Sequence, residues 1–410
     1  MPAETKSWRS SVAVFLAAPM IVALFTLSAS TGPAASYLAI LSALAGLALT
    51  EPKRLRAWSV DWGMMMLVAA FVVIAAAFSL SANDISDLAA IGDFLILLVA
   101  LPAYLVFRLA ARRSAALTVA VAAWIGAAIA VISGGYEVYV LNLGRATGGF
   151  TPIYFSDIGA ALGFVALLGI LAPGPKWRWL LVSGPLLGLA CVQLGGTRGA
   201  LVGIAVLALV AGVAVLRRWP KHWWHLLLGV GAAAAIIIAV AATIDISRLA
   251  AVPALIAQAL GGGETSDASL NYRLEFYSAG FQAFLASPVF GHGWWERFPA
   301  ALPYMSPEAA ALYVGPVSHL HNDMINFASA AGLLGLLAYG LMMLAPMVSA
   351  WRSPHDSQRP FRLAASAAMS LGFLAFGLSD AVFVFEVPKT FYILGSVAIL
   401  GFCRDEPLRA

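Results

Sequence analysis

Two histidines lie two positions apart in the segment Ser318-His319-Leu320-His321-Asn322, which is followed by Gly332 and Gly335. An imidazole takes up and releases protons near neutral pH, so either histidine could act as a general base. We expect His321 and Asn322 on the first turn of an apolar helix, at an outer surface. A histidine that only caps that helix would give the same pattern, and the residue types leave both interpretations open.

Arg198 stands in the segment Gly196-Thr197-Arg198-Gly199, between two apolar stretches. Thr197 is a residue type that caps helix N-termini, which would place Arg198 beside free backbone N–H groups. A guanidinium there suits an anion such as phosphate, and the flanking glycines let a ligand approach the backbone. The alternative is a boundary arginine that only anchors the helix at a membrane surface.

Two further arginines are candidates for an anion site. Arg273 belongs to a segment whose apolar spacing predicts an amphipathic helix along the outer leaflet. Its guanidinium could bind an anion or form an ion pair with Glu275 or another carboxylate of the loop. Arg145 lies next to glycines in Gly144-Arg145-Ala146-Thr147-Gly148-Gly149 and is a weaker candidate. The apolar residues that indicate the helix are Leu270, Phe276, Phe281, Phe284 and Leu285.

The elements that must position these residues are membrane helices. Of the 410 residues, 61% are hydrophobic and 11% charged, whereas a soluble domain carries about 25% charged residues. This excludes a soluble enzyme, a disordered protein and a nucleic-acid-binding module. Apolar runs near 20 residues, the length that crosses a bilayer, recur along the chain. We therefore predict an all-α polytopic membrane protein with about twelve transmembrane helices, at 11–30, 33–50, 60–81, 88–109, 115–133, 157–172, 179–194, 199–216, 226–244, 321–349, 362–380 and 388–403.

The basic residues set the predicted orientation. With both termini cytoplasmic, 18 of the 24 Lys and Arg residues face inward, as the positive-inside rule requires. The other six are Arg145, Arg198, Arg248, Arg273, Arg297 and Lys389. Positive charge is scarce on the outer face, which makes these residues candidates for function.

The predicted organisation has three parts. Residues 1–244 form helices 1–9, residues 245–320 form a large outer loop with amphipathic helices, and residues 321–410 form helices 10–12. The chain has no phosphate-binding GxxxxGK[ST] loop, so no nucleotide is expected. It has no clustered carboxylates typical of a metal cage, so no metal is expected either. The outer carboxylates Asp84, Asp87 and Asp93 receive no role.

These sites, in this order on twelve spans with one late outer loop, resemble the O-antigen ligase and polymerase superfamily. Its pattern of His, then Asn, Ser or Gln, nine residues, Gly, two residues and Gly matches His321-Asn322, Gly332 and Gly335. The Arg-Gly pair of its middle loop corresponds to Arg198-Gly199, and the Arg-x-x-Gly of an earlier loop to Arg145. Its loop arginine, followed by Pro and Gly-x-Gly, corresponds to Arg273 with Pro288, Gly291 and Gly293.

The resemblance implies a GT-C-like glycosyltransferase architecture and a role for each site residue. His321 is the catalytic base, and Arg198, Arg273, Arg145 and His319 contact the donor. Asn322, Gly199 and Thr197 support them, and no cofactor or metal takes part.

The reaction implied is that of an O-antigen ligase in lipopolysaccharide biosynthesis. It moves O-antigen polysaccharide from undecaprenyl pyrophosphate to a sugar hydroxyl of lipid A–core oligosaccharide, with inversion, on the periplasmic side of a Gram-negative inner membrane. The partners are these two lipid-linked glycans and membrane lipids. Three alternatives stay open: an O-antigen polymerase, a protein O-oligosaccharyltransferase, and a lipid-linked glycan transporter without chemistry.

Overall fold

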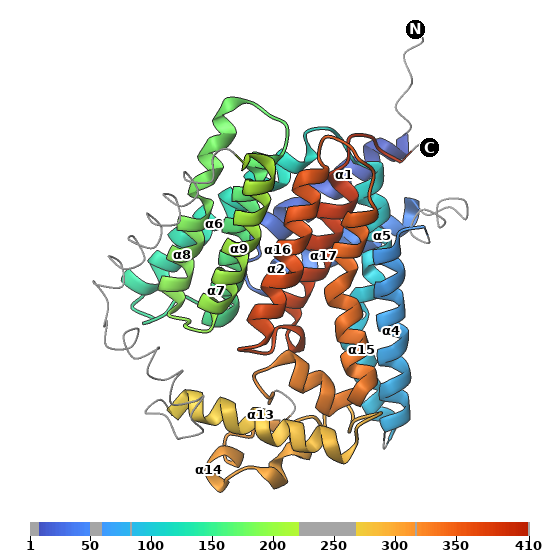
Figure 1. Cartoon of the computed structure of the whole chain (residues 1–410), viewed down its shortest axis with the longest axis vertical. Coiled ribbons are helices and arrows are strands. Elements are labelled where there is room, and N and C mark those ends of the chain that lie inside the picture. Colours follow the sequence, from blue (N-terminus) through green and yellow to red (C-terminus); the bar gives the residue numbers. More distant parts are fainter. Residues whose placement is uncertain (1–7, 50–59, 83, 221–267, 316–317, 409–410) are drawn as a thin grey trace.

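The computed structural model describes residues 8–49, 60–82, 84–220, 268–315 and 318–408. Within these ranges the regular structure is entirely helical (Figure 1). The α-helices are α1 (Trp8–Val22), α2 (Pro33–Ala45), α4 (Trp62–Ser81), α5 (Ile96–Leu109), α6 (Ala115–Tyr139), α7 (Pro152–Leu168), α8 (Gly184–Gly195), α9 (Ala200–Arg218), α13 (Ala268–Ala286), α14 (Pro307–Ala310), α15 (Asp323–Arg352), α16 (Arg359–Gly377) and α17 (Glu386–Phe402). A π-helical turn, η1 (Ala23–Leu27), continues α1, and 3₁₀ segments are η2 (Gly46–Leu49), η3 (Ile85–Phe94), η4 (Gly169–Leu171), η5 (Lys176–Ser183), η7 (Pro299–Tyr304) and η9 (Val382–Val384).

The chain is an all-α polytopic membrane protein. Nine helical segments of the described residues are long and apolar enough to cross a bilayer. Helices lie at each of the twelve predicted spans except 226–244, which falls outside the described residues. The ends differ by several residues in places. For example, α7 begins at Pro152 rather than 157, because the Thr151 hydroxyl accepts the Tyr154 N–H and caps the helix there.

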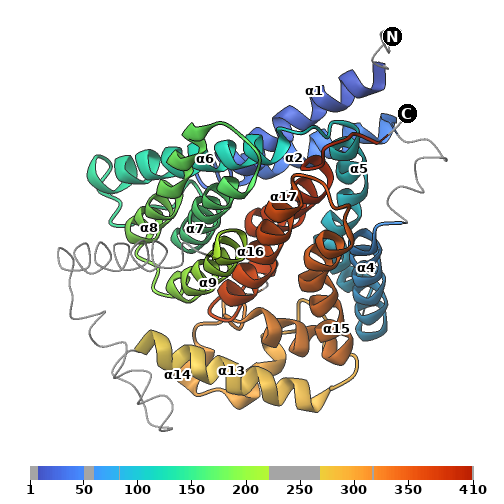
Figure 2. The ribbon, with the colours of Figure 1, turned by 45° about the horizontal axis from the view of Figure 1, so that its top comes forward.

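Figure 2 shows α16 and α17 in the middle of the bundle, with α7, α8 and α9 on one side and α4, α5 and α15 on the other. The pairs α4–α15, α7–α8 and α9–α16 pack along one another. Every residue of α17 except Glu386 is buried, including Lys389. A fully covered helix of this kind forms the centre of the protein.

Loops that the span assignment places on the same side contact each other. Gly32 N–H donates to the carbonyl of Gly148 at 2.9 Å, and both lie in predicted outer loops. The Gln358 side-chain Nε2 donates to the carbonyl of Arg112 at 3.0 Å, and both lie in predicted inner loops. These contacts agree with the alternation of the predicted spans.

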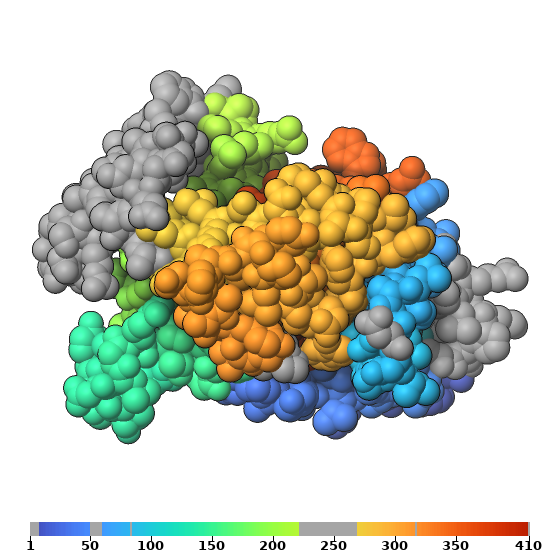
Figure 3. All heavy atoms as spheres, turned by 90° about the horizontal axis from the view of Figure 1, so that it is seen from below, coloured from blue at the N-terminus to red at the C-terminus, as the bar shows by residue number. Residues whose placement is uncertain are grey.

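Residues 268–315 form a separate layer across one end of the bundle (Figure 3). Its helix α13 covers the segment that the sequence predicts to be helical and lies across the bundle axis (Figure 1). The layer has its own apolar core, made of Phe276, Ala279, Ala283, Phe298, Ala301, Ala309 and Leu320. Part of the predicted outer loop is therefore a packed cap over the end of α15 and α16.

The cap is tied to α15 by a break in that helix. Gly332 has φ 59° and ψ −143°, a left-handed conformation that interrupts the helical hydrogen bonds. The segment after α13 takes their place: Leu333 N–H donates to Pro288 O at 2.8 Å, and Gly293 N–H donates to Ala330 O at 2.9 Å. A Cβ on Gly291 would lie 2.3 Å from the carbonyl carbon of Ala330, so only glycine allows this approach.

We expect Gly332→Ala to destabilise the protein. A positive φ with ψ near −143° is used almost only by glycine and costs about 1–3 kcal/mol for a residue with a Cβ. That Cβ would also lie 2.5 Å from the Val289 carbonyl. The matched control is Gly340→Ala in the same helix, where an added Cβ meets nothing within 4 Å; it should be neutral or stabilising by about 0.5–1 kcal/mol. Thermal unfolding in detergent measures both, and equal melting temperatures would contradict this account of the break.

Candidate active site

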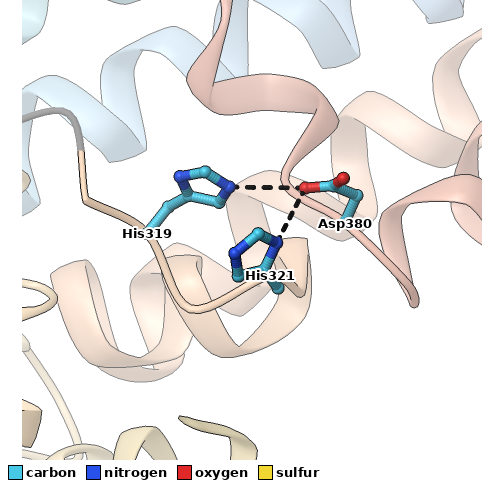
Figure 4. A group of neighbouring side chains, drawn as sticks. All are labelled: His319, His321 and Asp380. Atoms are coloured by element: carbon cyan, nitrogen blue, oxygen red, sulfur yellow. Dashed lines mark hydrogen bonds and ion pairs between the residues drawn. The ribbon is translucent and has the colours of Figure 1, made fainter. Parts of the chain in front are cut away.

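His319, His321 and the carboxylate of Asp380 meet in one cluster (Figure 4). Nε2 of His319 lies 3.3 Å and Nδ1 of His321 lies 3.2 Å from the same oxygen, Oδ1 of Asp380. The two rings are 4.3 Å apart between centroids. Asp380 lies in the turn between α16 and α17, and 2% of it is exposed. His321 and His319, which precede Asp380 by 59 and 61 positions, therefore share one buried carboxylate oxygen as acceptor.

Electrostatics fix which nitrogen of His321 is free. Burial alone would raise the pKa of Asp380, but hydrogen bonds from His319 and His321 outweigh it and hold the pKa well below its usual range. The side chain is therefore an ionised carboxylate, which only accepts hydrogen bonds. In the neutral ring of His321, the proton must then lie on Nδ1, facing Asp380. Its Nε2 carries a lone pair and can act as a base.

The backbone around His321 is held in an unusual conformation. Its φ is 49°, which is rare for a residue with a side chain and recurs at functional sites. Asn322 is the N-cap of α15: its Oδ1 accepts the Ile325 N–H at 3.1 Å, and its Nδ2 donates to Leu378 O at 3.1 Å. The prediction that His321 and Asn322 lie on the first turn was wrong, because the cap places the helix start at Asp323.

Aromatic groups fix the two imidazole rings. Phe276 of α13 stacks on His321 with an interplanar angle of 9°, and Phe385 meets His319 edge-on. The Tyr277 hydroxyl lies 3.0 Å from the carbonyl of His321, and burial raises the pKa of Tyr277 to about 12, so it stays a donor. The side chain of His321 is 29% exposed against 15% for His319. His321 is the more accessible of the two.

Arg198 and Arg273 both have a neighbour in Gly199: Arg198 precedes it in the chain, and Arg273 approaches it from α13. Arg198 is exposed in the turn between α8 and α9. A Cβ on Gly199 would lie 3.7 Å from Nη1 of Arg273 and 2.8 Å from Oγ of Ser379, the neighbour of Asp380. Three segments far apart in the sequence thus converge: the α8–α9 turn, α13 and the α16–α17 turn.

The predicted alternative for Arg273, an ion pair with Glu275, does not form. Glu275 instead accepts the backbone N–H of Ser306. In the part of the chain that the structure describes, no carboxylate lies within ion-pair distance of Arg273. Among these residues, therefore, no carboxylate neutralises its guanidinium.

Thr197 and Arg145 organise the turn that presents Arg198. The prediction that Thr197 caps α9 was wrong: Gly199 occupies the N-cap, without a side-chain bond. The Thr197 hydroxyl instead accepts from Arg145 Nη2 at 3.2 Å and from Ser156 at 3.1 Å. Arg145 Nε also donates to Gly195 O at 2.7 Å. Burial lowers the pKa of Arg145, and its bonds lie within the protein.

The other outer basic residues have structural partners. Arg297 stacks on Trp294 and donates to Ser318 O at 3.0 Å. Lys389 donates to the carbonyl of Asp93 at 2.5 Å. Arg248 lies outside the described residues. Of the described arginines predicted at the outer face, Arg273 and the neighbour of Arg198, Gly199, lie near the turn that carries Ser379 and Asp380.

The outer carboxylates without a predicted role prove to be structural. Asp84 and Asp87 form a reciprocal cap at the start of η3. Hydrogen bonds from Ser86 lower the pKa of Asp84. Asp93 Oδ2 accepts from Trp294 Nε1 at 3.1 Å. Sequence reasoning missed the carboxylate that matters, Asp380, although its place at the outer end of a predicted span was a usable signal.

The three grouped side chains are also the only described ones that could together hold a metal ion. The nitrogen and oxygen atoms that they offer all lie within 4.8 Å of one another.

Comparison with protein families finds a match in the middle of the chain. Residues 183–340 match the family model described as O-antigen ligase. This segment is similar to the O-antigen ligase family. It includes Arg198, Arg273, His319 and His321, whereas Asp380 lies beyond it. The family supports ligase- or polymerase-type function in lipopolysaccharide biosynthesis. No curated protein matches the chain.

We expect Asp380→Asn to reduce O-antigen transfer by at least about 10²-fold, near the lower end of what a general base contributes. The amide removes the charge that keeps the His321 proton on Nδ1. Asp380→Asn combined with His321→Ala should be no worse than His321→Ala alone, because both changes remove the same function. Asp87→Asn, an outer carboxylate away from the cluster, is the control. Additive losses in a transfer assay would contradict the coupling.

Proposed function

We propose that this protein is an O-antigen ligase that transfers O-antigen polysaccharide from undecaprenyl pyrophosphate to a sugar hydroxyl of lipid A–core oligosaccharide. One observation carries the proposal. His321, in the loop before α15, lies 3.2 Å from the buried carboxylate of Asp380 on the α16–α17 turn. Ser379 of the same turn lies close to Gly199, the neighbour of Arg198. This transfer needs a base for the acceptor hydroxyl close to a region that binds the anionic pyrophosphate.

Arg198 and Arg273 act on the leaving group. The donor's anomeric carbon is bonded to a pyrophosphate oxygen, and breaking this bond leaves negative charge on the phosphate. Guanidinium groups bind phosphate oxygens in bidentate fashion and stabilise charge that develops in the transition state. Within the described residues Arg273 forms no ion pair, which favours this role.

His321 acts on the acceptor. A sugar hydroxyl is a weak acid, so its oxygen attacks well only if a base removes the proton as the new bond forms. Nε2 of His321 takes that proton while the hydroxyl oxygen bonds to the anomeric carbon and undecaprenyl pyrophosphate departs. A single direct displacement inverts the anomeric configuration. The donor is already activated, so the step consumes no nucleotide.

The location proposed is the periplasmic face of a Gram-negative inner membrane, with both termini cytoplasmic. The first turn of α1 and the last turn of α17 lie at the end of the bundle opposite the cap (Figure 1). The excess of predicted inner Lys and Arg residues supports that direction.

The lipopolysaccharide of a deletion strain tests the function. Loss of every O-antigen rung with intact lipid A–core indicates a ligase. A single-repeat rung would point to a polymerase instead. An unchanged profile would contradict both.

We expect Arg198→Lys to remain strongly impaired although it keeps the charge. Lysine lacks the planar fork that binds two phosphate oxygens. Loss of one hydrogen bond between charged groups costs about 1.5–3 kcal/mol, or roughly 10- to 100-fold in transfer. Arg217→Lys, at the other end of α9, is the matched control. A fully active Arg198→Lys in a transfer assay would show that a simple positive anchor is enough.

We also expect the two histidines to differ. His321→Ala should abolish transfer, by roughly 10²–10⁴-fold, while the protein still inserts and binds donor, because it removes the base alone. His319→Ala should instead weaken donor or acceptor binding. Transfer and donor binding are measured for both variants. A dead His319→Ala beside a near-normal His321→Ala would reverse the assignment, and activity in both would rule out histidine base catalysis.

A further inference from the structure

The His319–His321–Asp380 cluster has the dimensions of a zinc site. Zinc binds imidazole nitrogen at about 2.0–2.1 Å and carboxylate oxygen at about 2.0–2.2 Å, so neighbouring ligand atoms of a tetrahedron lie about 3.3–3.5 Å apart. The two nitrogen–oxygen separations here are 3.3 and 3.2 Å, and the three ligand atoms all lie within 4.8 Å of one another. Small adjustments of the side chains would bring them around one ion.

The surroundings favour a cation at this place. Oδ2 of Asp380 is buried and makes no hydrogen bond within the described residues, so the carboxylate has an unused oxygen. The buried carboxylates of Asp157 and Asp323 lie within electrostatic reach of Asp380. Arg273 opposes them. The 29% exposure of the His321 side chain gives an ion a way in from solvent.

We propose that His319 Nε2, His321 Nδ1 and the Asp380 carboxylate bind Zn²⁺, and that the bound ion switches the enzyme off. The binding follows from the geometry alone, whereas the inhibition rests on the proposed function. Two imidazoles and one carboxylate with an open fourth position are a ligand set that zinc accepts.

The inhibition follows from the tautomer of His321. Without metal, the neutral ring carries its proton on Nδ1 and its lone pair on Nε2. Zinc bonds to the lone pair of a deprotonated nitrogen. When zinc binds Nδ1 of His321 and Nε2 of His319, the proton of each ring moves to its other nitrogen, both rings stay neutral, and zinc-bound waters are displaced. Nε2 of His321 is then a donor and cannot take the proton of the acceptor hydroxyl.

The binding experiment uses the full-length, metal-stripped protein in detergent, titrated with Zn²⁺ alone against a competing chelator. His319→Ala, His321→Ala and Asp380→Asn should each weaken zinc binding by more than the 10- to 100-fold typical of losing an outer partner of a ligand. His355→Ala, an exposed histidine of the α15–α16 connection, and His222→Ala with His225→Ala are the controls. If the three cluster variants keep the wild-type zinc affinity, or if a control variant loses it, the ion does not bind at His319, His321 and Asp380.

The second measurement is transfer by the same metal-stripped protein. Transfer should proceed without zinc, fall at least tenfold when zinc fills the site, and recover on adding chelator. An increase of transfer with zinc would overturn the inhibitory role and indicate metal catalysis. Absence of transfer by the metal-free protein would overturn the proposed function, while the binding experiment would still decide the site.

Discussion

The buried carboxylate of Asp380 holds the segments of the candidate active site together. A carboxylate taken out of water is costly unless hydrogen bonds replace its hydration. Here Oδ1 accepts from Ala381 N–H at 2.7 Å and from both histidines. Each donor comes from a segment that must therefore stay in place: the α16–α17 turn and the loop before α15. Asn322 and Tyr277 join the same segments through the carbonyl of Leu378.

The glycines of the histidine pattern act through packing rather than chemistry. The nine residues between Asn322 and Gly332 are the first part of α15, with the histidine before it and the break after it. At the break, the backbone of Pro288 and Gly293 replaces helical hydrogen bonds and fixes the cap that carries α13. Because Arg273 and Phe276 lie on α13, this distant joint also determines how the arginine and the stacking ring approach His321.

The sequence predicted the helices well because apolar length is a local property. It also found the segments of Arg198, Arg273 and His321 from unusual charge at an outer face and from a family pattern. Asp380 escaped because its partners lie 59 and 61 positions away. The caps at Thr197 and Asn322 were misjudged for a similar reason: Arg145 and Ser156 draw Thr197 away from the helix, and these contacts have no local signature.

The tautomer of His321 tests the central claim most directly. Protein labelled with ¹⁵N-histidine and compared with His321→Ala identifies its ring signals by NMR. For the neutral form of the ring, we predict a proton on Nδ1 and none on Nε2, a preference that disappears in Asp380→Asn. A neutral wild-type ring protonated on Nε2, or a spectrum unaffected by Asp380→Asn, would contradict the account.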